Sequence, residues 1–579
     1  MEEKITANGL LFDFNSQDET VHPAVEFLEE TNGVSFWRVR FAWDAEKIPE
    51  EIRLRLEFPA VELYSAWTPA SDHERYVGRN WRKPQFESRL ASFMPLLVFS
   101  TKRNVTAFSV ALSDIKTPIR VGYGIEQYQC DMEIDFSFFC NLTNPMTAYE
   151  TVLRVDRRPL DFASTVRSAR AWYSDLGYRA AVAPDAARAP LYSTWYSYHQ
   201  EVDEASLLRE CRAARKLGMR TIIVDDGWQN ERHAPLYDFV GDWRPARNKF
   251  RSMRGFVEKV HAIGMKVMLW FSVPFVGFYA KRHAEFEGKY LESSDRLHAS
   301  ILDPRYPETR AFTVSLYENA MREWDLDGLK LDFINNIRSN GEVREGMDFT
   351  SVEDATEQLL REIYRALTAI RPDALIEFRA PYMGPIVTAY SNMMRVLDCP
   401  DDHLVNRASS LDLRLTSDTC AVHSDMIEWR REEPKEAVAT QLWGVLFSVP
   451  QISVRMAELT PEQRATLRNF LDFRVAHAEA IDRGTLTLNA PETFYSLALA
   501  ETDRETVGVT FAENVFAPRR PMTYLVNLTP APIVLKTDRR CRFSVADCTG
   551  KRLGRARVTR AALTEVDVPL GGMLTVEQL

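Results

Sequence analysis

The sequence predicts a multidomain protein: a central (β/α)₈ TIM barrel, an N-terminal antiparallel β-sandwich and a small C-terminal β domain. Three observations support this order. Short segments of alternating apolar and polar residues fill the first part of the chain. A strand–loop–helix pattern then repeats, and short alternating segments return near the end. We therefore place the predicted domains at 1–175, 176–482 and 483–579.

The N-terminal segments have the period of strands that are buried on one face. Stretches such as VSFWRVRFAW, IRLRLEF and MEIDFSFFC alternate between apolar and polar residues and are separated by polar turns. Successive strand residues point to opposite faces of a sheet, so this alternation predicts half-buried strands and a sandwich. The segment PLDFASTVRSARAWYSDLG predicts a helix that leads out of this domain.

The middle of the chain alternates apolar strands with helical patterns. Gly218 ends the first of these helical patterns, as expected for a helix C-terminus. No glycine-rich phosphate loop follows any predicted strand, so a closed parallel barrel is favoured over an open doubly wound sheet. The predicted strands are 191–199, 220–228, 266–275, 328–334, 375–382, 394–400, 420–429 and 450–456.

Composition narrows the classes of partner. The formal net charge is −10 and no Lys/Arg cluster stands out, which argues against a nucleic-acid or anionic-membrane partner. The N-terminus is acidic, with no signal-peptide apolar region, and no stretch is long enough to span a bilayer. The seven cysteines are scattered, with no CxxC, which predicts free thiols in a reducing cytosol. We expect a cytoplasmic protein without metal or cofactor.

Polar and aromatic residues gather where the predicted strands end. Barrel enzymes place their active sites at the C-terminal ends of the strands. Carboxylates accept hydrogen bonds from hydroxyls, and flat rings cover the apolar face of a sugar. The sequence thus predicts a pocket for a small oligosaccharide or glycoside. The residues concerned are Asp225, Asp226, Asp332, Arg379, Asp398, Asp425, Trp195, Tyr198, Trp228 and Trp270.

The GLKLDF strand carries the sharpest signal. Lys330 and Asp332 are two residues apart on a strand, so their side chains share one face. A nearby ammonium favours the ionised carboxylate and lowers its pKa, which suits a nucleophile. The alternative is a buried ion pair that only fills the barrel.

A retaining glycosidase also needs a second carboxyl group about 5–5.5 Å from the first, which donates a proton to the leaving oxygen. The segment MRVLDCPDDH offers Asp398, Asp401 and Asp402. Close like charges and burial raise a carboxyl pKa, as an acid requires. Asp398 lies nearest the strand end and is favoured. The alternative is that these residues cap the helix that begins near Leu404.

In VDDGWQ, two adjacent acids end a strand. Asp225 and Asp226 are placed to bind neighbouring hydroxyls of one sugar, and Gly227 allows a tight turn before Trp228. The alternatives are a helix N-cap or a metal site, although a hard metal needs more oxygen ligands than these.

Together these motifs resemble glycoside hydrolase family 36, whose members are α-galactosidases and their relatives. The resemblance rests on VDDGW, MLWFSVP, the LDP turn at 302–304, GLKLDF and the arginine-led acidic strand, and it covers essentially the whole chain. It implies a retaining double displacement. By this resemblance Asp332 is the nucleophile, Asp398 the acid/base, and Asp225, Asp226, Trp228, Lys330 and Arg395 contact the substrate. From their places at the strand ends we also expect substrate contacts from Trp195, Trp270, Arg379 and Asp402.

One stretch departs from the family pattern. Where many members carry a Cys-Ser-Gly-Gly type stretch, this chain reads IEFRAPYMGP, so we expect Glu377, Arg379 and Tyr382 to face the substrate. This leaves open another α-sugar, such as N-acetylgalactosamine, or a transglycosylase of the raffinose-synthase type. More distant alternatives are a Schiff-base aldolase using Lys330 and a non-catalytic sugar-binding protein. The resemblance is also compatible with a homo-oligomer.

Overall fold

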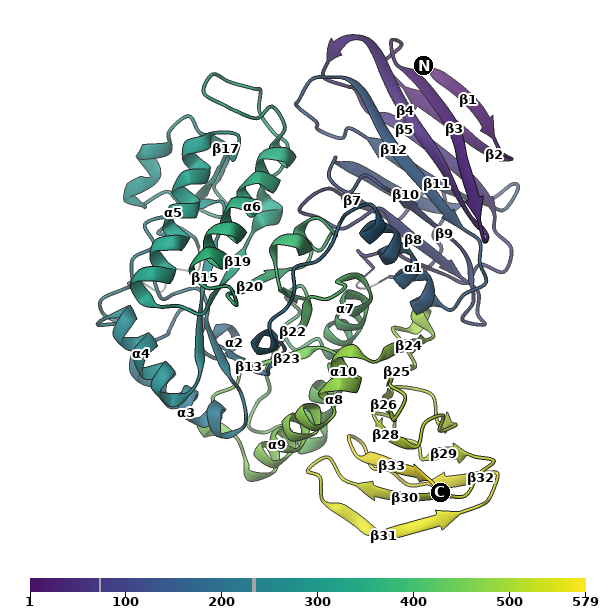
Figure 1. Cartoon of the computed structure of the whole chain (residues 1–579), viewed down its shortest axis with the longest axis vertical. Helices are drawn as coiled ribbons and strands as arrows, with labels where there is room; N and C mark the ends of the chain where they lie inside the picture. The colour runs from purple at the N-terminus through teal and green to yellow at the C-terminus, as the bar shows by residue number, and fades with distance from the viewer. Residues whose placement is uncertain (72–73, 232–235) are drawn as a thin grey trace.

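The computed structural model describes residues 1–71, 74–231 and 236–579 and arranges them as three units (Figure 1). Two antiparallel sheets are followed by a closed barrel of parallel strands, and further sheets end the chain. The predicted fold class is therefore confirmed.

The N-terminal unit is a sandwich of two six-stranded sheets. Its core is the layer of inward-facing side chains between the sheets, including Phe12, Trp37 and Phe136. One sheet has the order β1 (Glu2–Ala7), β2 (Leu10–Ser16), β5 (Ile52–Pro59), β11 (Asp131–Phe138), β10 (Ile119–Ile125) and β7 (Gln85–Ser88). The other has the order β3 (His22–Thr31), β4 (Val34–Lys47), β12 (Met146–Asp156), β9 (Thr106–Leu112), β8 (Leu96–Ser100) and β6 (Ser65–Trp67).

The barrel closes in chain order, and every neighbouring pair of its strands is parallel. Each strand falls on a predicted segment and is shorter than predicted, because the predicted segments included the loops that follow. The strands are β13 (Leu191–Ser193), β14 (Thr221–Val224), β15 (Lys266–Ser272), β19 (Gly328–Asp332), β20 (Leu375–Arg379), β21 (Met393–Arg395), β22 (Ala421–Ile427) and β23 (Val449–Ile452).

A small sheet is inserted between β15 and β19. The apolar run predicted as one strand ends at Ser272, and its last residues join β16 (Phe275–Gly277), which pairs with β18 (Ala299–Leu302). The third strand of this sheet is β17 (Tyr290–Ser294). Pro274 separates the two strands; because proline lacks an N–H, it interrupts a hydrogen-bonded ladder.

The helices begin and end at the expected signals. Asp203 caps α3 by accepting a hydrogen bond from Ser206 N at 2.9 Å, and Gly218 follows the helix with a φ of 101°. The helices are α1 (Phe162–Asp175), α2 (Trp195–Tyr198), α3 (Glu204–Lys216), α4 (Met253–Ile263), α5 (Pro307–Trp324), α6 (Val352–Ile370), α7 (His403–Thr416), α8 (Lys435–Gly444), α9 (Pro461–Ala476) and α10 (Ala478–Arg483). Single 3₁₀ turns lie at Asp185–Arg188, Lys281–Phe286, Ile334–Asn336, Val387–Tyr390, Met456–Glu458 and Pro491–Thr493.

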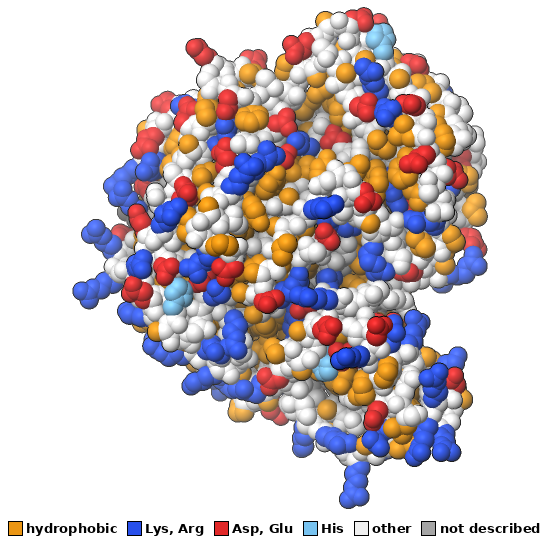
Figure 2. Space-filling model, viewed as in Figure 1, with side chains coloured by type: hydrophobic (Ala, Val, Ile, Leu, Met, Phe, Trp, Pro, Cys, Tyr) orange, Lys and Arg blue, Asp and Glu red, His pale blue; other side chains and the backbone are white. Residues whose placement is uncertain are grey.

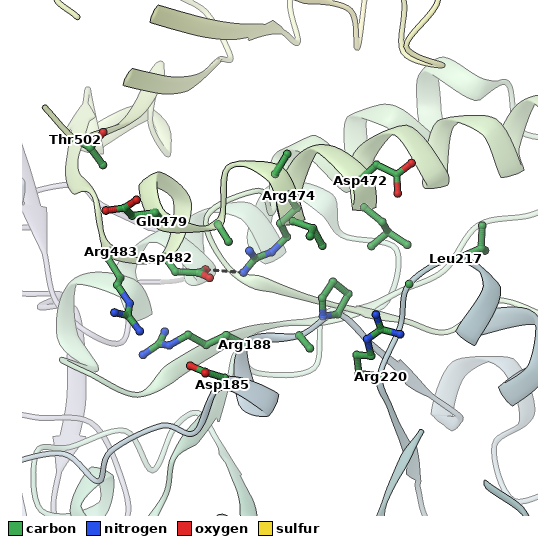
Figure 3. Close-up of a pocket in the computed structure, with 17 residues that line it drawn as sticks. Asp185, Arg188, Leu217, Arg220, Asp472, Arg474, Glu479, Asp482, Arg483 and Thr502 are labelled. Carbon is green, nitrogen blue, oxygen red and sulfur yellow. Dashed lines mark hydrogen bonds and ion pairs between the residues drawn. The ribbon is translucent and has the colours of Figure 1, made fainter. Parts of the chain in front are cut away.

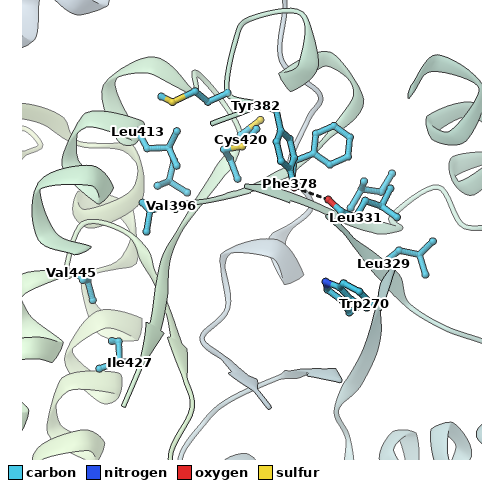
Figure 4. Packing of buried hydrophobic residues seen from close by; sticks show 14 of the residues in the cluster. Trp270, Leu329, Leu331, Phe378, Tyr382, Val396, Leu413, Cys420, Ile427 and Val445 are labelled. Carbon is cyan, nitrogen blue, oxygen red and sulfur yellow. Dashed lines mark hydrogen bonds between the residues drawn. The ribbon is translucent and has the colours of Figure 1, made fainter. Parts of the chain in front are cut away.

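Apolar and charged side chains alternate along β19, so the two kinds lie on opposite faces of the strand. Leu329 and Leu331 belong to the apolar cluster that joins the strands to the surrounding helices, while Lys330 and Asp332 use the other face (Figure 4). Tyr382 ties the next strand's loop to β19, because its hydroxyl donates to Leu331 O at 2.9 Å. The strand therefore holds its polar side chains on a well-packed support.

The C-terminal unit holds a seven-stranded and a three-stranded sheet. The larger has the order β24 (Thr485–Asn489), β25 (Leu497–Glu501), β26 (Glu505–Thr510), β28 (Met522–Asn527), β33 (Met573–Gln578), β30 (Cys541–Ala546) and β31 (Arg552–Thr559); the smaller has the order β27 (Val515–Phe516), β29 (Ile533–Lys536) and β32 (Leu563–Val566). The edge strand β31 carries exposed arginines 552, 555 and 557, and basic side chains crowd this unit (Figure 2). The expectation of no Lys/Arg cluster is therefore wrong here; charges on an edge strand hinder pairing with other chains.

Two further features concern membrane-spanning helices and the cysteines. Within 1–71, 74–231 and 236–579, no helix is both long and apolar enough to cross a membrane. The seven cysteines are free thiols, and Cys130 alone among them is exposed.

Candidate active site

Asp332 lies at the C-terminal end of β19 with its two carboxylate oxygens in different surroundings. Oδ1 accepts hydrogen bonds from Phe333 N at 2.8 Å and Arg379 Nε at 2.5 Å, and Tyr382 Oη lies 3.4 Å away. Oδ2 accepts a hydrogen bond from Trp270 Nε1 at 3.1 Å. Most of the hydrogen bonds go to Oδ1, so Oδ2, which accepts one, keeps a free lone pair that can react.

The nearest cation to Asp332 is not the one that the sequence suggested. Lys330 Nζ lies 2.6 Å from Asp225 Oδ2, whereas Arg379 forms the ion pair with Asp332. The prediction that Lys330 lowers the pKa of Asp332 is confirmed, but Lys330 forms its ion pair past β15 with Asp225 rather than with Asp332. We call Asp225, Lys330, Asp332 and Arg379 the Asp332 side of the site.

The charges around Asp332 keep it ionised. Burial by itself would raise the pKa of this carboxyl, but the charges of Arg379 and then Lys330 outweigh burial and hold the pKa below its usual range. The following residue, Phe333, has a φ of 64°, an unfavourable value for a bulky side chain. Such strain is concentrated at functional sites, and here it lets the backbone N–H of Phe333 turn back to Oδ1.

Asp226 is held by amides rather than by a cation. Gln200 Nε2 donates to one oxygen at 2.7 Å and Gln229 Nε2 to the other at 2.6 Å. Burial raises the pKa of Asp226, and the two amides oppose that rise. Gly227 has a φ of 114°, and an added Cβ would lie 2.5 Å from Gln200 Cα, so the predicted tight turn requires glycine.

On the other side of the barrel mouth, one guanidinium serves several carboxylates. Arg395, at the end of β21, pairs with Asp398 at 2.7 Å and with Asp425, and its Nε lies 3.9 Å from Glu377 Oε1. A register shift in β22 between His423 and Met426 accompanies the inward placement of Asp425. We call Arg395, Asp398, Asp425 and Glu377 the Arg395 side.

Asp398 and Asp425 share the guanidinium of Arg395, and their pKa values shift in opposite directions. Burial acts to raise the pKa of Asp398, but Arg395 and Arg379 hold it well below its usual range. Burial raises the pKa of Asp425 against the pull of Arg395. The expectation that Asp398 has a raised pKa is therefore wrong, because Arg395 and Arg379 act more strongly on Asp398 than burial does.

Glu377 is the deepest carboxyl of this group. It is fully buried, and burial raises its pKa to about 7 despite Lys330 and Arg395 nearby. Gln451 Nε2 donates to its Oε2 at 2.6 Å. The expectation that Glu377 and Tyr382 face the substrate is wrong, because both side chains are covered completely. Arg379 is the residue of that stretch that reaches Asp332.

The predicted tryptophans have different positions. Trp270 donates to Asp332, and Trp195 at the start of α2 is partly exposed at the same end of the barrel. Trp228 is fully buried against Trp243 and Trp324, and its Nε1 donates to Trp270 O at 2.9 Å. Trp228 is thus a support for Trp270 and not a pocket wall, because the chain turns away from the mouth at Gly227.

Two other predicted contacts are occupied by structural partners. Asp402 is the N-cap of α7 and accepts a hydrogen bond from Val405 N at 3.0 Å, the alternative that the sequence left open. The guanidinium of Arg395 is fully buried among its carboxylates, so the predicted substrate contact for it is not supported.

The sequence analysis missed two tyrosines at the site. Tyr196 Oη donates to Asp425 Oδ2 at 2.8 Å. Tyr237 is stacked 6.2 Å from Trp270, and the charges of Asp226 and Asp332 help burial to raise its pKa. The neighbouring Trp195 was a signal for Tyr196, whereas Tyr237 lies in a loop with no strand pattern. In the described parts of the chain, no group of three or more His, Cys, Asp or Glu is placed to hold a metal ion.

The barrel carries carboxylates, arginines and aromatic rings at the C-terminal ends of its strands, an arrangement typical of glycoside hydrolases. Comparison with known proteins agrees with this class. Residues 178–380 match the Melibiase family model. The match spans β13 to β20, so it includes the whole Asp332 side and ends before Arg395 and Asp398.

Relatives and solved structures point the same way. Alpha-galactosidase Mel36A from Lactobacillus acidophilus is 29% identical over 102 residues, which cover 17% of this chain and 14% of that protein. The GH36 alpha-galactosidase AgaA from Geobacillus stearothermophilus, as a variant in complex with raffinose, superimposes with a TM-score of 0.64 at 14% identity, covering 98% of this chain and 83% of that one. An alpha-galactosidase from Lactobacillus brevis has a TM-score of 0.64 at 14% identity, with 98% and 81% covered. The predicted resemblance to glycoside hydrolase family 36 is confirmed.

Proposed function

We propose that this protein is a retaining α-galactosidase that hydrolyses terminal α-galactosides by double displacement. The observation that carries the proposal is the carboxylate of Asp332, kept ionised by Arg379 at the end of β19 and presenting Oδ2 with one hydrogen bond. The relatives support the choice of sugar, since the matched proteins are alpha-galactosidases and solved AgaA variants hold raffinose or stachyose.

In the first step, Asp332 Oδ2 attacks the anomeric carbon, the bond from that carbon to the leaving oxygen breaks, and a galactosyl ester forms on Asp332. Asp398 donates a proton to the leaving oxygen. In the second step, Asp398 takes a proton from a water molecule. The water oxygen then bonds to the anomeric carbon, the bond from that carbon to Asp332 breaks, and free galactose leaves. Asp398 is preferred to Asp425 because its side chain is 46% exposed, whereas Asp425 is fully buried.

The proposed role of Asp398 as an acid requires a change in its ion pair with Arg395. A carboxyl paired with a guanidinium is ionised, so Asp398 can donate a proton only if its ion pair with Arg395 opens when the glycoside enters. The charge of Asp332 helps this opening, since the two carboxylates lie close enough for their charges to interact. Once Asp332 is esterified that repulsion disappears, which favours the ionised Asp398 needed as a base.

We assign sugar binding to the Asp332 side. Asp225 and Asp226 lie on consecutive residues at the end of β14, and their free lone pairs suit adjacent hydroxyl groups of one galactose. Trp195 and Tyr237 supply flat surfaces for the apolar face of the ring, while the buried Trp270 holds Asp332 through its hydrogen bond. The catalytic unit is the segment 176–482, and the substrates are galactosides or small oligosaccharides that end in α-galactose.

A fluorinated α-galactosyl reagent that forms a slowly hydrolysed ester tests the proposal directly. Incubation followed by digestion and mass spectrometry should locate the label on Asp332, in a one-to-one ratio with lost activity. A panel of nitrophenyl α-glycosides tests the sugar: α-galactoside should be turned over fastest. A label on another residue would contradict the nucleophile, and faster turnover of N-acetylgalactosaminide or glucoside would contradict the substrate.

A further inference from the structure

A cavity of about 790 Å³ lies at the floor of the barrel, at the opposite end from the candidate active site (Figure 3). Its lining comes from four parts of the chain: the 3₁₀ turn before β13, the residue before β14, the end of α9 with α10, and a loop of the C-terminal unit at Thr502. This volume lies within the range of roughly 300–1,000 Å³ that is usual for small-molecule sites. Neither the barrel chemistry nor the sugar assignment uses this space.

Two cations converge in the cavity. The guanidinium groups of Arg188 and Arg483 lie near each other at one end of it (Figure 3). Burial lowers the pKa of Arg188, and the charge of Arg483 lowers it further, against the attraction of Asp482. Two like charges close together repel each other, and an anion placed between them removes that repulsion.

The carboxylates of the cavity leave this pair of cations unmatched. Asp482 is engaged by Arg474, with Nη2 to Oδ1 at 2.7 Å. The other acids that line the cavity are exposed to water: Asp185, Asp472 and Glu479. Among the residues that the structure describes, no carboxylate comes within ion-pair distance of Arg188 or Arg483. Arg188 Nη2 donates instead to the backbone oxygen of Thr419 at 2.6 Å.

The remainder of the lining is largely apolar. Pro190, Leu471 and Val475 contribute to it, and Val475 is 63% exposed although it is β-branched and aliphatic. An apolar surface next to uncompensated cations suits a ligand with an anionic group at one end and an apolar body at the other.

We propose that the floor cavity binds a small organic phosphate, whose phosphate group bridges Arg188 and Arg483 and whose apolar part packs on Val475 and Leu471. Guanidinium groups present paired N–H donors that match phosphate oxygens, and two of them can share one phosphate. The cavity joins the strand starts of the barrel to α10 and the C-terminal unit, so a bound ligand ties these parts together.

Isothermal titration and thermal unfolding of the full chain test this proposal, with inorganic phosphate and phenyl phosphate as probes and sodium chloride to equalise ionic strength. Both probes should bind saturably and raise Tm, with phenyl phosphate the tighter because its ring meets the apolar lining. The double variant Arg188→Gln/Arg483→Gln should weaken both by about tenfold or more.

Arg212→Gln is the matched control, since Arg212 is an exposed arginine on α3 that does not line the cavity, and its binding should equal that of the wild type. Arg483 is exposed at the end of α10, so Arg483→Gln alone keeps the test interpretable if the half-buried Arg188 proves necessary for folding. The proposal is overturned if the wild type shows no saturable binding, or if the arginine variants bind both probes as tightly as the control. Phenyl phosphate binding no tighter than phosphate would overturn the apolar part.

Discussion

The two sides of the barrel mouth hold their carboxylates in opposite ways. On the Asp332 side each acid has its own cation: Arg379 pairs with Asp332 and Lys330 pairs with Asp225. On the Arg395 side, Asp398, Asp425 and Glu377 share a single buried guanidinium. The first arrangement keeps Asp332 ionised, whereas the second leaves at least one carboxyl able to hold a proton.

The difference separates the carboxyl groups of the pocket in acidity. Matched cations lower the pKa of Asp332, while burial with too few cations raises the pKa of Asp425 and of Glu377, the latter to about 7. Asp398 shares Arg395 with these two and has a lowered pKa while that ion pair is closed, so its ability to donate a proton depends on how the one guanidinium is shared. The following changes test that contrast.

Removing the nucleophile should have the largest effect. Asp332→Ala is expected to lower kcat on nitrophenyl α-galactoside by on the order of 10⁴- to 10⁶-fold, as for other covalent nucleophiles. Azide should restore part of the activity and yield the β-galactosyl azide, whose anomeric configuration NMR can check. Glu323→Ala, which changes an exposed acid on α5, serves as the control. Near-normal turnover by Asp332→Ala would remove the assignment.

Changing the Arg395 side should affect proton transfer. Asp398→Ala is expected to slow substrates with poor leaving groups by about 10²- to 10⁴-fold, and nitrophenyl galactosides with good leaving groups far less. Asp425→Asn should retain more activity but move the alkaline limb of kcat/KM to lower pH. One fewer carboxyl then shares Arg395 with Asp398, and the repulsion from Asp425 is removed, so the pKa of Asp398 falls further. If Asp425→Asn shows the leaving-group dependence and Asp398→Ala does not, the two roles are exchanged.

Removing the matched cation should shift the pH profile. The pKa of Asp332 is lowered in the folded site, so its ionised form persists to low pH and is lost only as pH falls through that value. Arg379→Gln raises this pKa, and the acidic limb of kcat/KM should move to higher pH by about 1–3 units. Arg379→Lys keeps the charge and should hold the limb near its original position. An unmoved limb in Arg379→Gln would show that Lys330 suffices.

Substitutions of the aromatic residues should give the smallest effects. They distinguish a ring that contacts the substrate from a ring that only stabilises the fold. Trp195→Ala is expected to raise KM by about 2- to 10-fold with little loss of stability, because it removes a partly exposed ring. Trp228→Phe should leave KM unchanged and lower the free energy of unfolding by about 1–3 kcal/mol, because that ring is fully buried. Urea unfolding and Michaelis kinetics on both variants check this; a KM effect confined to Trp228→Phe would reverse the placement.

Periodicity predicted the elements of this fold well. The strands of the barrel, the helix at Glu204–Lys216 and the sandwich all follow from alternation and helix-end signals in the sequence. The sheet between β15 and β19 was missed because its first strand continues the apolar run of β15, and a run of apolar residues does not reveal where the chain changes direction. Strands β27 and β31 were not predicted, because β27 is too short and β31 too polar to show the apolar–polar alternation of a half-buried strand.

The sequence by itself determined that Asp225, Asp332 and Asp398 lie at the ends of alternate barrel strands, since strand ends and residue types can be read along the chain. Only the tertiary structure decided which cation meets which acid. Lys330 crosses to Asp225, Arg379 takes Asp332, and Trp228 turns into the core after Gly227. The physical reason is that charge pairing depends on distances between different strands, which closure of the barrel fixes, whereas spacing along one strand fixes only the face on which a side chain lies.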